Sequence, residues 1–270
     1  MNAVLRSHLS SSQSALWRSL DALQGRPWPY CITAFHRISD RFADELSYPV
    51  RAFAELCRYW RDHYEILNLD RLLARLAHGD AAHHPTLVIT FDDGYADNAE
   101  VAAPILDALG LSATFFVTTG VMGSEHRFFW DQALAATPPL MNWNQVRELH
   151  AAGFGIGSHT VSHARLSVTR GAALEHELQA SRSRLESELG APVLDFAYPF
   201  GQAADCDGTA RAAVARAGYR CCLSCHGGLV AAGDSPYTLQ RISVSPKYHA
   251  TPHDWARRYL RARHSAKRAA

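Results

Sequence analysis

Short runs of apolar and β-branched residues alternate with longer segments of helical periodicity along most of this chain. The short runs predict strands at 30–35, 86–90, 112–118, 155–157, 193–196, 219–223 and 238–244. Apolar residues that recur every three or four positions predict helices at 53–62, 69–76, 97–109, 142–152, 171–189, 209–217 and 253–263. Strands and helices that alternate in this order form βαβ units, so we expect an α/β protein with a parallel sheet or barrel.

Nothing along the 270 residues marks a linker or an internal repeat, so we expect a single domain, 1–270. A further helix predicted at 15–23 belongs to an N-terminal helical extension, 1–27, and the barrel is expected to occupy 28–265. The opening segment lacks the apolar stretch of a secretory signal, and no segment has the length of a membrane span. We therefore expect a cytoplasmic protein, and peripheral contact of the basic segment 257–268 with the inner membrane face is left open.

The overall composition indicates a globular protein without a nucleic-acid partner, because the formal net charge is only +1 and acidic and basic residues are interspersed. Hydrophobic residues make up 47% of the chain, which is enough for a large core. The six cysteines are interpreted as reduced thiols, since the pair Cys222 and Cys225 lacks the second pair that a structural zinc site needs. Charged residues of the helix at 171–189 are interpreted as a solvated face; they are Glu175, Glu177, Arg182, Arg184, Glu186 and Glu188.

Two adjacent carboxylates, Asp92 and Asp93, follow the predicted strand at 86–90. Neighbouring carboxylates repel each other at the end of a core strand, so they need a cation or a hydrogen-bond network to stabilise them. Gly94 suits the sharp turn that such a site requires. The alternative is a loop that caps the next helix, because aspartate is common at turns and Asp97 stands at a predicted helix start.

Two histidines, His159 and His163, follow the predicted strand at 155–157. On a helical turn this spacing would place both imidazoles on one face, as zinc sites require, although a chain with 15 histidines also produces such pairs by chance. The carboxyl ends of the strands of an α/β barrel converge on one face. We therefore expect the histidines to lie near the two carboxylates.

Three segments in this order resemble the motifs of the polysaccharide deacetylases, the family 4 carbohydrate esterases with a NodB-like domain. Thr-Phe-Asp-Asp-Gly at 90–94 and Ser-His-Thr-x-x-His at 158–163 are similar to the first two motifs, and Phe-Ala-Tyr-Pro-Phe-Gly at 196–201 matches the Arg-x-Pro-Tyr loop in part. The resemblance extends from about 31 to 244. It implies an irregular (β/α) barrel of the NodB type. It also implies a hydrolase that removes the N-acetyl group from an amino sugar, so the expected partner is an N-acetylated glycan or a lipid-linked amino sugar.

The expected ligands of one divalent metal are Asp93, His159 and His163, which leave a coordination position open. Zn²⁺ suits this donor set best, and Co²⁺, Ni²⁺ and Fe²⁺ are left open. Asp92, beside the metal, is expected to act as the general base for an attacking water. His36 follows the first predicted strand, and a resemblance to exopolysaccharide deacetylases with rearranged motifs implies that it is the general acid.

The third motif supplies the expected substrate contacts, which are Tyr198, Pro199 and Phe200. The resemblance implies that the backbone N–H of Phe200 stabilises the oxyanion. The chain departs from the family pattern at Ala197, where the motif has arginine, and at Arg241, where the commoner pattern has histidine. Arg241 is a candidate for the role of the missing arginine, which orients the catalytic aspartate.

The segment at 120–140 lacks clear periodicity and carries Phe128, Phe129 and Trp130. These aromatic residues either stack on sugar rings or anchor the loop on the core.

Other classes of protein use similar residues. A haloacid-dehalogenase-type phosphatase has one residue between its two aspartates, and a zinc peptidase usually carries His-Glu-x-x-His, so both patterns differ from this chain. A non-haem iron oxygenase shares the two histidines and the carboxylate, but the second aspartate favours a hydrolase. A sugar-binding pseudoenzyme of the same fold, or a hydrolase of another non-peptide C–N bond, stays open.

Overall fold

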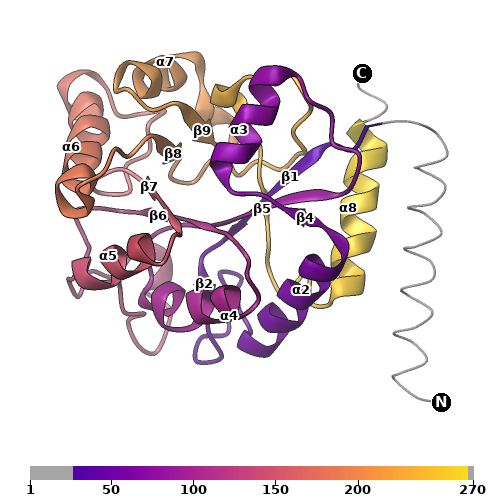
Figure 1. The fold of residues 1–270 in the computed structure, drawn as a ribbon. Helices are drawn as coiled ribbons and strands as arrows, with labels where there is room; N and C mark the ends of the chain where they lie inside the picture. The colour runs from indigo at the N-terminus through magenta and orange to yellow at the C-terminus, as the bar shows by residue number, and fades with distance from the viewer. Residues whose placement is uncertain (1–26, 267–270) are drawn as a thin grey trace.

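The structure is a computed structural model that describes residues 27–266, and its centre is a curled parallel sheet surrounded by helices (Figure 1). In this part of the chain eight strands form the sheet, in the order β10-β1-β5-β6-β7-β8-β9, with β4 also paired to β5. Their bounds are β1 Tyr30–Phe35, β4 Glu65–Ile66, β5 Thr86–Phe91, β6 Thr114–Val117, β7 Gly155–Ser158, β8 Asp195–Ala197, β9 Cys221–Leu223 and β10 Ile242–Ser243. The predicted helix at 15–23, and all but the last residue of the predicted extension 1–27, lie outside the described residues.

The segment at 239–243 links the two ends of the curled sheet. Leu239 forms a parallel bridge to β9, and β10 pairs with β1 a few residues later. The strand predicted at 238–244 is therefore wrong in extent, because the segment changes partner halfway and only β10 forms a ladder, after a 3₁₀ turn, η4 (Pro236–Thr238). The result is an irregular barrel, as the sequence predicted.

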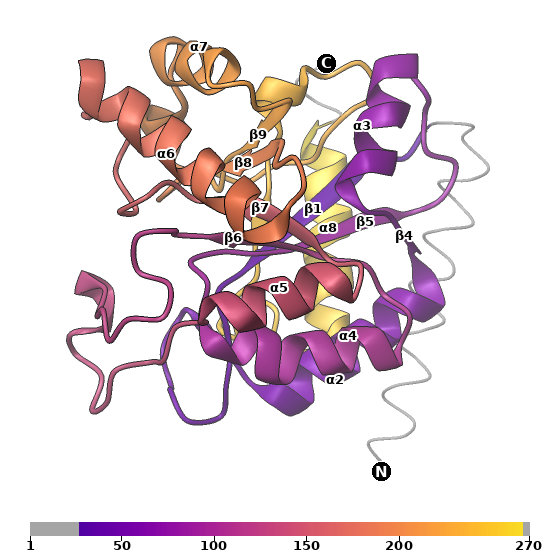
Figure 2. The ribbon, with the colours of Figure 1, turned by 60° about the vertical axis from the view of Figure 1, so that its left-hand side comes forward.

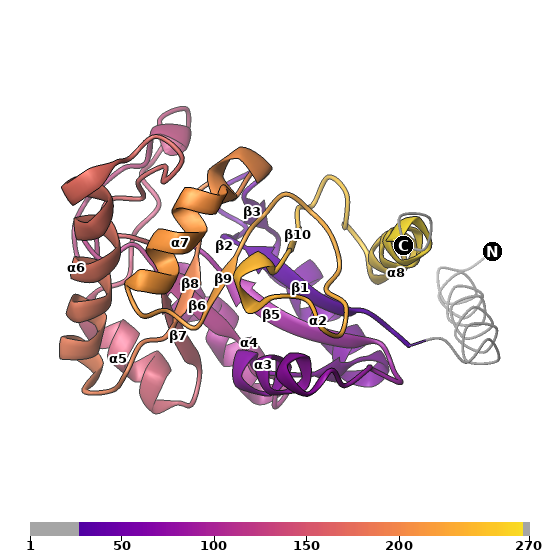
Figure 3. The same ribbon diagram turned by 90° about the horizontal axis from the view of Figure 1, so that it is seen from above.

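Seven helices in the described part of the chain pack around the sheet. They are α2 Val50–His63, α3 Leu69–His78, α4 Ala103–Ala108, α5 Trp143–Ala151, α6 Gly171–Leu189, α7 Gly208–Arg216 and α8 Pro252–Ala266. Helices α5, α4 and α2 follow one another below the sheet (Figure 2), whereas α6 and α8 lie at opposite ends of the molecule (Figure 3). None of the helices described within 27–266 is both long enough and apolar enough to cross a membrane.

The helix predicted at 97–109 does not begin as expected. A π-helical turn, η1 (Asn98–Ala102), precedes α4, and the Asp97 side chain does not cap it. Instead, Oδ1 of Asp97 accepts a hydrogen bond of 3.2 Å from the backbone N–H of Ile38. Ile38 belongs to β2 (Arg37–Ile38), which pairs with β3 (Ser47–Tyr48) in a small separate sheet. The aspartate thus ties the start of the helix to the loop after β1.

Aromatic side chains form the core beneath the carboxyl ends of the strands. Phe35 stacks on Phe91, and Phe91 on Phe115, with centroid distances of 5.4 and 4.8 Å across three neighbouring strands. Because successive side chains of a strand point to opposite faces, Thr90 and Asp92 face the other way, into the barrel. The sequence of β5 therefore directs one carboxylate into the interior.

The six cysteines are all free thiols. Five of them are buried, and Cys225 is half-buried at the edge of the pocket described below.

Candidate metal centre and active site

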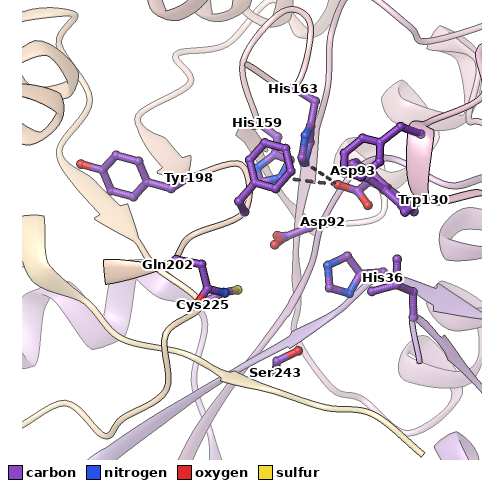
Figure 4. Close-up of a pocket in the computed structure, with 13 residues that line it drawn as sticks. His36, Asp92, Asp93, Trp130, His159, His163, Tyr198, Gln202, Cys225 and Ser243 are labelled. Atoms are coloured by element: carbon purple, nitrogen blue, oxygen red, sulfur yellow. Dashed lines mark ion pairs between the residues drawn. The ribbon is translucent and has the colours of Figure 1, made fainter. Parts of the chain in front are cut away.

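The predicted site residues gather at the carboxyl ends of the strands, as expected for an α/β barrel. His36 follows β1, the two aspartates follow β5, His159 follows β7 and Tyr198 follows β8. These residues border a pocket of about 320 Å³ (Figure 4). Chemistry-bearing side chains from distant parts of the chain therefore face one space.

Asp93, His159 and His163 surround one point in this pocket, and we call these three residues the metal-type group. Oδ1 of Asp93 lies 3.5 Å from Nε2 of His159 and 3.3 Å from Nε2 of His163. One ligand atom from each of the three lies within 4.8 Å of the others, and all three side chains are buried. Among the residues that the structure describes, no other group of histidine, cysteine, aspartate and glutamate side chains has such a geometry.

The hydrogen bonds around these three residues leave lone pairs free to bind a cation. Nδ1 of His159 lies 2.8 Å from the carbonyl oxygen of Ala197, which can only accept, so Nδ1 carries the proton. In the neutral ring, Nε2 then directs a lone pair at Asp93. The second carboxylate oxygen of Asp93 is buried and has no hydrogen-bond partner within 27–266. Lone pairs that converge in a buried space favour a metal ion between them, and this donor set suits Zn²⁺.

The protonation states also suit a metal site. Burial alone would raise the pKa of Asp93, but hydrogen bonds and charge from the imidazoles of His159 and His163, in their protonated forms, outweigh it and hold the pKa well below its ordinary value. A metal ion would supply that positive charge when the two imidazoles are neutral. Burial lowers the pKa of His163, against the opposing effect of Asp93. An ionised carboxylate and a neutral imidazole are the forms that bind metals.

The turns that carry the site use rare backbone conformations. Four non-glycine residues in the described chain have a positive φ, of 75°, 67°, 59° and 62°; they are Asp93, Thr160, His163 and Phe200. All four belong to loops at the pocket, where backbone strain is commonly concentrated. The two histidines therefore do not lie on a helical turn, as the spacing suggested, but on an irregular turn at 159–163.

Gly94 completes the turn after the two aspartates. Its φ is 90°, and a Cβ atom at this position would lie 2.6 Å from the side chain of Met122. The turn therefore favours glycine for its conformation, and a Cβ atom would displace the end of the Met122 side chain.

Asp92 lies beside the metal-type group and is held by Arg241. Its two carboxylate oxygens accept hydrogen bonds of 2.7 Å from Nη1 and Nη2 of Arg241. The guanidinium also donates to Oγ1 of Thr90 and to the carbonyl oxygen of Ser224, at 3.0 Å each. Burial would raise the pKa of Asp92, but Arg241 outweighs it, and the net pKa is lowered. Arg241 thus contacts the aspartate that the missing motif arginine was expected to orient.

His36 borders the same pocket, and its neighbour Arg37 anchors the loop after β1. Arg37 is completely buried and forms ion pairs with Asp44 and Asp131. The Tyr95 hydroxyl donates a hydrogen bond of 2.8 Å to Asp131. The indole N–H of Trp130 donates to the same hydroxyl, also at 2.8 Å. No sequence motif predicts this network, because its members come from three separate parts of the chain.

The aromatic loop at 120–140 anchors itself on the core with one ring and exposes another at the pocket. Phe128 is buried and anchors the loop, whereas Phe129 is 64% exposed at the pocket and stacks on Phe200 at 6.1 Å. Trp130 packs edge-on against His163, with ring centroids 4.8 Å apart. One part of the loop therefore supports the proposed ligand, and another part presents an apolar ring to solvent.

The third motif forms a tight turn that presents Phe200. The carbonyl of Pro199 accepts a 2.7 Å hydrogen bond from the N–H two residues later, as in a γ-turn. The Phe200 ring lies 4.8 Å from His163, and the guanidinium of Arg165 lies 3.9 Å from its centroid on another side. Pro199 is buried, and the phenol of Tyr198 points away from the two aspartates (Figure 4). Phe200 is therefore the residue of this motif whose side chain reaches the metal-type group.

The predicted solvated face of α6 is only partly correct. Glu175 is exposed, but Glu177 is half-buried and accepts hydrogen bonds from the backbone N–H groups of Val161 and Ser162. Charge pattern alone could not reveal this contact, because the partners lie in the turn between the two histidines.

A curled parallel sheet with a metal-type group at the carboxyl ends of its strands defines the (β/α) barrel of the NodB type. Residues 79–222, just over half of the chain, match the family described as polysaccharide deacetylase. The chain therefore belongs to the polysaccharide deacetylase family, whose members are hydrolytic deacetylases.

Comparisons with individual proteins agree with this assignment. YxkH of Bacillus subtilis (strain 168), whose name places it among the polysaccharide deacetylases, is 25% identical over 222 residues, which are 82% of this chain and 73% of the relative. The Streptococcus pyogenes deacetylase PplD, solved in complex with acetate, has a TM-score of 0.71 at 22% identity and covers 88% of this chain and 99% of its own. IcaB from Ammonifex degensii has a TM-score of 0.71 at 20% identity, and the match covers 84% of this chain and 97% of IcaB. These two structures confirm the predicted fold.

Proposed function

We propose that this protein is a metal-dependent deacetylase that hydrolyses the N-acetyl group of an amino sugar in a polysaccharide, oligosaccharide or glycolipid. The observation that supports the proposal is that the side chains of Asp93, His159 and His163 converge as a set that could hold one divalent ion, next to the carboxylate of Asp92, which is not part of this set. Zn²⁺ is the expected ion, because catalytic zinc sites use imidazole and carboxylate ligands. Co²⁺, Ni²⁺ and Fe²⁺ accept the same donors.

The residues around this site have separate proposed roles. A divalent ion held there supplies polarisation of the acetyl carbonyl and activation of water. Asp92 is positioned to accept the proton as water attacks, and Arg241 keeps it ionised and oriented. His36, which borders the same pocket, gives a proton to the departing amine. The N–H of Phe200, which donates no hydrogen bond within 27–266, is the proposed donor to the oxyanion.

Aromatic side chains at the pocket support a sugar as the substrate. Phe129, Trp130 and Phe200 contact one another and border the pocket, and Phe129 keeps most of its surface in solvent. The apolar faces of sugar rings pack well on such flat apolar surfaces. An N-acetylated glycan or a lipid-linked amino sugar therefore suits this pocket.

Acetate release from a panel of N-acetylhexosamine oligomers and nucleotide sugars, measured with metal content, tests the proposal. The wild-type protein is expected to bind metal and release acetate. Asp92→Asn is expected to release acetate about 10²–10⁴-fold more slowly while keeping its metal, since it loses the general base. A sugar-binding pseudoenzyme would bind glycans without releasing acetate, and equal rates for the two proteins would contradict the role of Asp92.

A further inference from the structure

The turn at 159–163 carries two of the proposed ligands and does not satisfy its own backbone. Thr160 and His163 have positive φ, so the helical hydrogen bonds expected for this spacing are not formed. The N–H groups of Val161, which is half-buried, and of Ser162, which is exposed, therefore find their acceptors outside the turn.

Glu177 of α6 provides these acceptors. Its Oε2 accepts hydrogen bonds from the N–H of Val161 at 2.8 Å and from the N–H of Ser162 at 2.9 Å. Its Oε1 accepts a third, of 2.6 Å, from the hydroxyl of Ser162. Three donors of one short turn therefore meet on a single carboxylate, and each bond is strengthened by the negative charge.

Main-chain groups after β6 hold the opposite side of the turn. The N–H of Thr119 donates to the carbonyl of Thr160 at 3.0 Å, and the N–H of Gly120 donates to the carbonyl of Val161 at 2.8 Å. A Cβ atom at Gly120 would lie 2.6 Å from that carbonyl oxygen, so the close contact requires glycine. The carbonyls of Thr160 and Val161 are therefore held by backbone, and the N–H groups of Val161 and Ser162 by one side chain.

The two histidines differ in how much they depend on this turn. His159 is fixed independently, because its N–H bonds the carbonyl of Val117 and its ring bonds the carbonyl of Ala197. His163 comes at the far end of the turn, and within 27–266 its ring has Asp93 as its polar partner and aromatic rings on other sides. The position of His163 therefore depends on the shape of the turn.

We propose that Glu177 is a positioning residue of the metal centre, which holds the turn at 159–163 in its strained shape so that the imidazole of His163 stays directed at Asp93. This inference rests on the proposed metal-dependent function. Residues that hold the ligands of a metal site commonly change its affinity by 10- to 100-fold when they are replaced.

The Zn²⁺ affinity of the full chain, measured by competition with a chromogenic chelator, tests the inference. Glu177→Ala is expected to bind Zn²⁺ about 10- to 100-fold more weakly than the wild type. Glu177→Gln is expected to lose less, because its amide oxygen still accepts from the two N–H groups. The control is Glu175→Gln, which removes the same charge from an exposed position two residues earlier on α6 and is expected to bind as the wild type does.

Wild-type affinity in both Glu177 variants would overturn the inference, and so would an equal loss in Glu175→Gln, which would indicate a general effect of charge. If Glu177→Ala does not fold, the isosteric Glu177→Gln decides. Weaker Zn²⁺ binding by this variant, with an unchanged urea midpoint of its metal-free form, supports the positioning role. Unchanged Zn²⁺ binding refutes that role. A wild-type protein that binds none of Zn²⁺, Co²⁺, Ni²⁺ and Fe²⁺ refutes the proposed function and this inference together. The two failures are therefore distinguishable.

Discussion

Arg241 and Asp92 form a bidentate ion pair inside the barrel, with both N···O distances at 2.7 Å. The aspartate follows β5, and the arginine comes from the segment that links β9 to β1 at the closure of the barrel. Both side chains are buried, so solvent does not balance either charge. The closure of the barrel and the orientation of the proposed base therefore depend on the same contact.

Removing Arg241 is expected to destabilise the fold. Arg241→Met leaves the carboxylate of Asp92 buried without its partner, and the free energy of unfolding in urea is expected to fall by about 3–5 kcal/mol. The double variant with Asp92→Asn is expected to recover much of this loss, because it removes the unpaired charge. A single variant that unfolds at the wild-type urea concentration would show that the ion pair does not stabilise the barrel.

The buried network around Arg37 offers a matched comparison of two ion pairs. Asp131 is almost completely buried, whereas the Asp44 side chain is 27% exposed. Asp131→Asn is expected to lower the free energy of unfolding by about 3 kcal/mol or more, as for a buried pair. Asp44→Asn is expected to cost about 1 kcal/mol, because solvent screens the charge. Equal losses in the two variants, measured by urea unfolding, would show that the buried Arg37–Asp131 pair stabilises the fold no more than the Arg37–Asp44 pair.

Phe129 is expected to act in substrate binding rather than in stability. Phe129→Ala should raise KM for an N-acetylated oligosaccharide about fivefold, the equivalent of about 1 kcal/mol of lost stacking, with little change in kcat. Its thermal midpoint should match that of the wild type, because the side chain is 64% exposed. Val168→Ala, at another exposed apolar residue, is the control and should change neither quantity. An unchanged KM for Phe129→Ala would remove this residue from the binding surface.

The fold and the convergence of the candidate ligands could be predicted because both follow from local patterns. The alternation of strands and helices indicates a parallel sheet or barrel, and the family resemblance implies the barrel, whose strand ends meet on one face. Asp93 lies two residues after β5 and His159 directly follows β7, so both reach the same rim. The structure brings them together with His163, although by an irregular turn instead of the helical turn that the spacing suggested.

Contacts that depend on the closure of the barrel or on distant loops could not be predicted from pattern. The apolar residues at 238–244 resemble a full strand, but the segment pairs first with β9 and then with β1. Glu177 has the spacing of a solvated residue, yet its partners lie in a loop 15 and 16 positions earlier. Arg37 carries no motif, and only the folded chain shows its buried carboxylate partners.

The most direct test of the central claim compares the metal content of two variants at adjacent positions, Asp92→Asn and Asp93→Asn, after dialysis against a buffer without metal. We expect close to one equivalent of divalent metal in the wild type and in Asp92→Asn, and a large loss in Asp93→Asn, because only Asp93 faces both imidazoles. Equal metal content in the two variants, or a loss in Asp92→Asn alone, would contradict it.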